Sequence, residues 1–84
     1  MSLEYYKKQM IDLRARLAKE KEAKKQDNER YAGYIKSASS PSSKASYRKS
    51  KIDRAASHDR QIESIKHSIE MCKENIARER KNKK

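Results

Sequence analysis

Apolar residues recur at alternating steps of three and four along both halves of the chain, the spacing of a helical stripe with a coiled-coil period. The stripe of the first half consists of Leu3, Tyr6, Met10, Leu13 and Leu17. The stripe of the second half consists of Ala55, His58, Ile62, Ile65, Ile69, Cys72 and Ile76. Each half therefore predicts one long helix with a narrow apolar side.

A serine-rich segment, residues 37–43, separates the two halves and contains the only proline of the chain. Serine is a favoured N-cap and proline a favoured first helical residue, so Ser40-Pro41 predicts the start of the second helix. We expect a helix over residues 2–36 with Ser2 as its N-cap, a second helix over residues 41–80, and a basic tail over residues 81–84. A short connection favours antiparallel neighbours. The sequence thus predicts a single all-α domain, a long antiparallel two-helix hairpin (coiled coil).

Folding the chain about residue 40 pairs residue i with roughly residue 80 − i, and the two halves then match. The apolar ends meet, with Met10 near Ile69 and Cys72. The polar stretch of the first stripe, Glu20 to Asp27, meets His58 and Asp59, and the tyrosines near the bend meet Tyr47. Polar stripe positions can fix register and partner number; the alternative interpretation is a loosely packed, solvated stretch.

The stripe also predicts self-association. Ile11, Ala15 and Ala18 widen the apolar side of the first helix, and a stripe of isoleucines favours bundles of more than two helices. A chain of this size usually needs such support. We expect two hairpins to pair into a four-helix bundle, as a homo-oligomer of two or four hairpins. Gly33 either lets a partner helix approach closely or marks fraying near the bend. The predicted oligomer seam consists of Leu3, Tyr6, Met10, Leu13, Leu17, Ile62, Ile65, Ile69 and Ile76.

Charge gives a second hypothesis. Charged residues make up 42% of the chain, and its formal net charge is +11. Such an excess attracts polyanions, and Lys44, Arg48, Lys51 and Arg54 recur at helical spacing after the bend. The alternative function is therefore nucleic-acid binding through these four residues, which could equally form a solvated face.

Several classes of function lack a signal. No apolar run reaches the length of a membrane span, and the first residues lack the order of a signal peptide, so we expect a cytoplasmic protein without membrane contact. His58 and His67 have no ligands at zinc spacing, and we interpret His58 as a polar residue of the stripe. Cys72 lies on the isoleucine stripe as a small hydrophobic residue. We expect no metal, no cofactor and no enzyme activity.

The opening Leu3-Glu4-Tyr5-Tyr6, the serine-rich bend running into Ser43-Lys44-Ala45-Ser46-Tyr47-Arg48, and the isoleucine-spaced basic helix resemble one known kind of module. It is the amino-terminal helical-hairpin module of bacterial proteins that end in a TIR domain or another effector of antiviral defence. The resemblance implies an assembly module that oligomerises an attached or partner effector, and it carries over no catalytic residue. A third hypothesis is a small protein that docks by helix-in-groove contact on an unrelated partner.

Overall fold

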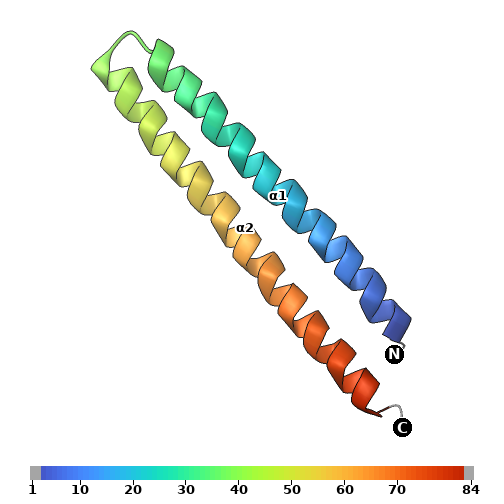
Figure 1. Cartoon of the computed structure of the whole chain (residues 1–84). Helices are drawn as coiled ribbons and strands as arrows, with labels where there is room; N and C mark the ends of the chain where they lie inside the picture. Colours follow the sequence, from blue (N-terminus) through green and yellow to red (C-terminus); the bar gives the residue numbers. More distant parts are fainter. Residues whose placement is uncertain (1–2, 83–84) are drawn as a thin grey trace.

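The computed structural model describes residues 3–82, which form two antiparallel helices joined by a tight bend (Figure 1). Helix α1 spans Leu3–Ser37 and helix α2 spans Pro41–Asn82. The rod measures 68 × 14 × 12 Å, and its radius of gyration is 19.1 Å, against about 12 Å for a compact domain of this length. The expected all-α hairpin is confirmed.

The helix boundaries differ slightly from those expected. Helix α1 continues through Ser37, and α2 continues through Asn82, so Lys81 belongs to the helix and not to a tail. Ser2, the expected N-cap of α1, and the last two residues of the expected tail lie outside the described residues. The bend is correspondingly shorter than the serine-rich segment, because residues 41–43 already form the first turn of α2.

The start of α2 has the expected cap. The Ser43 amide donates to Ser40 Oγ at 3.1 Å, which satisfies one of the amides that have no partner within the helix. The Lys44 amide donates to the Ser40 carbonyl, also at 3.1 Å, as the first α-helical bond. At the end of α1, the Ser37 hydroxyl donates back to the Gly33 carbonyl at 3.0 Å. The start of α2 is therefore capped by a serine hydroxyl, whereas the Ser37 hydroxyl bonds back to its own helix.

The two stripes face each other along the rod, in the pairing that the sequence predicts. Met10, Ile69 and Cys72 form a buried cluster, and the Cys72 thiol donates to the Tyr6 carbonyl at 3.1 Å. Ile62 of α2, which lies nearer the bend than this cluster, is also buried. The partly buried residues packed against the cluster are Tyr6, Leu13, Leu17, Ile65 and Ile76. Within one chain the predicted seam residues thus close the hairpin.

Aromatic rings occupy the seam below the bend. The ring centroid of Tyr34 lies 5.3 Å from that of Tyr47 in α2, and the ring centroid of Tyr31 lies 5.4 Å from that of Tyr34. Gly33, beside them, is helical, and a Cβ there would have nothing within 4 Å. Packing inside the hairpin therefore gives no reason for a glycine at this position, and α1 does not fray there.

The residues expected to widen the apolar side of α1 point away from α2. Ile11 is 68% exposed, and Ala15 and Ala18 are also exposed. Ile52 of α2 has the same exposure as Ile11. A hairpin has room for one contact stripe per helix, so apolar residues beside that stripe remain at the surface.

Candidate functional site

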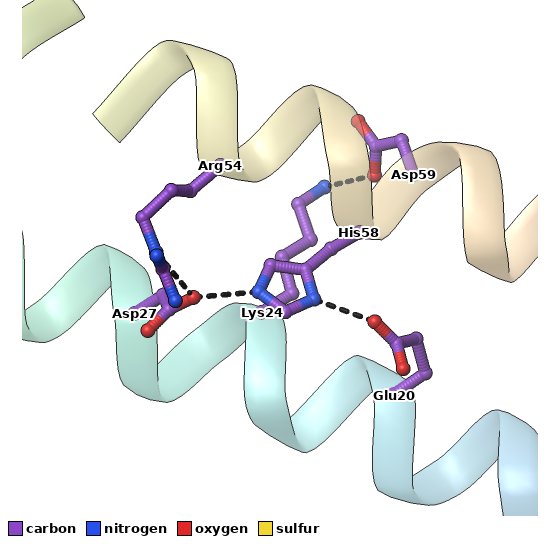
Figure 2. Close-up of polar contacts among 6 residues, drawn as sticks. All are labelled: Glu20, Lys24, Asp27, Arg54, His58 and Asp59. Carbon is purple, nitrogen blue, oxygen red and sulfur yellow. Dashed lines mark hydrogen bonds and ion pairs between the residues drawn. The ribbon is translucent and has the colours of Figure 1, made fainter. Parts of the chain in front are cut away.

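The middle of the seam, between the apolar cluster and the tyrosines below the bend, holds a cluster of charged side chains. Figure 2 shows these side chains. His58 of α2 lies between two carboxylates of α1, with Nδ1 2.6 Å from Glu20 Oε1 and Nε2 2.6 Å from Asp27 Oδ2. A carboxylate only accepts hydrogen bonds, so both ring nitrogens donate and the ring is an imidazolium. We call this group, with the ion pairs around it, the central cluster.

Two further cross-helix pairs extend the central cluster. Arg54 Nε donates to Asp27 Oδ2 at 3.0 Å, and Lys24 Nζ donates to Asp59 Oδ1 at 2.6 Å. The guanidinium of Arg54 also lies over the Tyr31 ring, 5.8 Å from its centroid. The six side chains drawn in Figure 2 comprise three carboxylates and three cations. Their charges therefore balance inside a chain that is otherwise strongly basic.

Asp27 is the buried charge of the central cluster, with 6% of its surface exposed. Burial alone would favour its neutral form, but the hydrogen bonds from His58 and then from Arg54 outweigh burial and lower the pKa of Asp27. The pKa of His58 is raised, mainly by the hydrogen bond to Asp27 and next by that to Glu20. Each partner thus keeps the other charged.

This arrangement can select one alignment of the helices. A buried carboxylate without its cations is costly. Arg54 and His58 are one turn apart on α2, so sliding α2 along α1 by one turn would leave Asp27 level with only one of the two cations and would break the bridge of His58 between Glu20 and Asp27. The apolar stripes tolerate such a slide better, because the apolar residues of α1 would again meet isoleucines of α2. The polar stretch of the stripe is therefore an ordered set of ion pairs and not a loosely packed, solvated region.

Among residues 3–82, no group of three or more His, Cys, Asp and Glu side chains could hold a metal ion.

The four basic residues predicted to contact nucleic acid do not form one open face. Arg54 is engaged by Asp27 and Tyr31. Arg48 and Lys51 line a hollow of about 400 Å³ beside the seam, whose other lining residues include Ile35 and Ile52. Within the described part of the chain, Lys44, Arg48 and Lys51 have no carboxylate partner. Three of the four cations therefore remain available to an outside anion, while Arg54 is part of the central cluster.

Sequence reasoning predicted which zones meet but missed how they are paired. The match of Glu20–Asp27 with His58 and Asp59 is confirmed by the contacts above. The pair Asp27–Arg54 was missed, because Arg54 was assigned to the basic surface. One signal could have revealed it: Arg54 and His58 are four residues apart on α2, so both can reach the same carboxylate of a facing helix.

Two further observations concern the chain as a whole. No helix over residues 3–82 combines the length and the hydrophobicity that crossing a bilayer requires. Comparison with known proteins gave no match, either to a protein family, to a curated sequence or to a solved structure. Inferences about function therefore depend on the hairpin itself.

Proposed function

We propose that this protein is a non-enzymatic assembly module that associates with copies of itself into a bundle of hairpins. The observation that carries the proposal is how few apolar side chains the hairpin buries. Among the described residues only Met10, Ile62, Ile69 and Cys72 are buried apolar side chains, and none of them is fully buried. Ile11 and Ile52 meanwhile remain two-thirds exposed.

The physical reason is the small apolar area that two helices can remove from water. Burial contributes roughly 25 cal/mol per Å² of apolar surface, and a rod 14 × 12 Å in cross-section leaves most of each helix in solvent. Small helical proteins commonly gain the missing stability by oligomerisation. Pairing hairpins side by side would give each helix a second contact face.

The central cluster supports an assembly function because it fixes the alignment of the two helices. A module that holds copies in fixed geometry needs a hairpin whose outer surface is the same in every copy. In this proposal the assembly holds an attached or partner effector in place, as the resemblance to modules of bacterial defence proteins implies, and it does so in the cytoplasm.

The experiment that tests the proposal is the solution mass of the chain, measured by light scattering over a range of concentrations at low and at high salt. We expect a mass that is a multiple of that of one chain and persists at high salt, because apolar contacts are not screened. A monomer at every concentration and salt would overturn the proposal.

Nucleic-acid binding is a second candidate, favoured by the absence of carboxylate partners around Lys44, Arg48 and Lys51 in the described residues. To test this function, the light-scattering measurement is repeated with a short DNA duplex added. The variant K44E/R48E/K51E should lose duplex binding and keep its helicity, whereas Arg54 is left intact because it is one of the partners of Asp27. Duplex binding that weakens steeply with salt would support this function; binding unchanged by the three substitutions would contradict it.

A further inference from the structure

An open hollow beside the seam, in the half of the rod next to the bend, combines an apolar lining with cations. Its volume is about 400 Å³. Mostly apolar hollows of this size with a few polar groups are typical of binding sites. Six residues from both helices line it, and we call it the bend hollow: Asn28, Ile35, Arg48, Lys51, Ile52 and Ala55.

The bend hollow has both an exposed apolar side chain and free positive charge. Ile52 is 68% exposed. Arg48 and Lys51 are three residues apart, so they are neighbours on the surface of α2, and no carboxylate among residues 3–82 pairs with either of them. Arg54 differs from them, because Asp27 holds it. The site therefore offers an apolar contact and two unpaired cations side by side.

The surroundings of the bend hollow are also basic. Residues 28–55 contain seven Lys and Arg against two Asp and Glu. Glu29 is two residues after Asp27, which lies in the seam, and Asp53 is two residues before Ala55, which lines the hollow. Two residues correspond to about 200° around an α-helix, so both carboxylates lie on the outer sides of their helices. Neither one neutralises the bend hollow.

These features specify the chemistry of an occupant. It needs an apolar side chain for the hollow and carboxylates beside that side chain for Arg48 and Lys51. Because the hollow lies between two helices, a third helix can lie along it and present these groups at steps of three and four residues. A second copy of this chain is a poor occupant, since its net charge of +11 would bring cations to cations.

Nucleic acid fits the cations of the bend hollow but not its apolar lining. Phosphates pair with Arg and Lys, and a duplex backbone has no apolar side chain that could fill the hollow. Single strands stack their bases on aromatic rings, and none of the six lining residues is aromatic. The apolar lining therefore favours an acidic protein segment over nucleic acid.

We propose that the bend hollow is the docking site for an acidic amphipathic helix of a partner protein. The helix inserts an apolar side chain between Ile35 and Ile52 and pairs its carboxylates with Arg48 and Lys51. This inference goes beyond the assembly function, because a single hairpin contains the whole site. The site shares no residue with the central cluster, so docking requires no change in the alignment of α1 and α2.

The probe for this site is a synthetic, fluorescently labelled helical peptide of about 20 residues, with a stripe of leucines at alternating steps of three and four, glutamates on both sides of the stripe and alanine elsewhere. One control peptide has glutamine for every glutamate, and the other has serine for every leucine. Each peptide is kept at trace concentration and titrated with the intact chain, and binding is followed by fluorescence anisotropy. The first peptide should bind at least tenfold more tightly than either control.

The apolar part of the site is tested by two equally exposed isoleucines. I52A removes most of the side chain that the peptide covers and should weaken binding of the first peptide about tenfold or more. I11A is the matched control, because Ile11 is also 68% exposed but lies toward the open end of the hairpin, and it should leave the dissociation constant unchanged. Both variants should keep the helical circular dichroism of the parent.

The charged part of the site is tested by two double variants that remove the same charge. R48Q/K51Q should weaken binding of the first peptide about tenfold and reduce its dependence on salt. K7Q/R14Q is the control, because Lys7 and Arg14 are exposed near the open end and also have no carboxylate partner among the described residues. It should bind the peptide as the parent does, which separates a specific site from attraction by net charge.

The outcomes distinguish this site from the other functions. Absence of peptide binding, equal binding of the three peptides, or equal effects of I52A and I11A would each refute the site. If a DNA duplex binds and R48Q/K51Q weakens it while no peptide binds, these cations serve nucleic acid and the inference is wrong. Peptide binding by a chain that light scattering shows to be a monomer would support the site and overturn only the assembly function. A chain that assembles but binds no peptide would do the reverse.

Discussion

Asp27 of α1 and His58 of α2 are joined by a 2.6 Å contact between Oδ2 and Nε2 in the middle of the hairpin. They are 31 residues apart in sequence, and the contact exists only when the two helices are aligned as observed. Glu20 holds the other ring nitrogen of His58 at the same distance. The imidazolium of His58 thus bonds to two carboxylates that lie about two turns apart along α1.

The stability of the hairpin should depend on pH through His58. Its folded-state pKa is raised above the ordinary value of 6.5, so its contribution is fully present below pH 6.5 and is lost as pH rises through the raised pKa. We expect the thermal midpoint, followed by circular dichroism at fixed protein concentration, to fall over that range. H58Q should flatten this dependence, and H67Q, at an exposed site outside the central cluster, should keep it. An unchanged dependence in H58Q would contradict the assignment.

Asp27 should produce a second, opposite dependence at acid pH. Its folded-state pKa is lowered below the ordinary value of 3.8, so its contribution is present above pH 3.8 and disappears as pH falls through the lowered pKa. We expect D27N to be less stable than the parent at pH 5 and to lose less stability on acidification. D12N, at an exposed carboxylate outside the cluster, is the control. Equal acid sensitivity of D27N and the parent would count against the role of this carboxylate.

Removing a buried side chain from the apolar end should destabilise the hairpin strongly. I69A deletes part of the cluster with Met10 and Cys72 and should lower the free energy of unfolding by about 2–4 kcal/mol. I52A removes the same atoms from a site that is 68% exposed and should change it by less than about 0.5 kcal/mol. Urea unfolding at one protein concentration measures both; similar losses in the two variants would refute the assignment of the core.

The cap at the bend should contribute measurably. S40A removes the oxygen that accepts from the Ser43 amide and should lower the free energy of unfolding by about 1 kcal/mol. S39A is the matched control in the same bend, because no hydrogen bond of the Ser39 side chain occurs within the described residues. Urea unfolding should separate the two variants, and a loss in S39A as large as that in S40A would indicate that bend flexibility, and not capping, is responsible.

Replacing Gly33 should stabilise the protein. The residue is helical, and a Cβ would have nothing within 4 Å, so G33A gains the helix propensity of alanine without a clash. The expected gain in the free energy of unfolding is about 0.5–1 kcal/mol. If G33A instead weakens association while the helicity is kept, then another helix approaches Gly33 closely in the assembly.

The sequence by itself determined the hairpin. The three–four spacing of Leu13, Leu17, Ile62 and Ile65 is a property of local helix geometry, and Ser40-Pro41 specifies a helix start through its own hydroxyl and ring. Matching apolar and polar zones about the bend then determined the pairing of Met10 with Ile69 and Cys72. These inferences need only periodicity and the length of the chain, which is why they agree with the structure.

Only the tertiary structure decided how the charges are used. Arg54, Lys51 and Arg48 look alike in a basic helix, yet only Arg54 reaches Asp27, because its position on α2 brings it level with that carboxylate across the seam. Ile11 belongs by its sequence to an apolar side, yet it is exposed, because a lone α2 covers a single stripe of α1. A long flexible side chain pairs with whichever opposite charge lies near it in space, and the helical pattern of the sequence does not specify which charge that is.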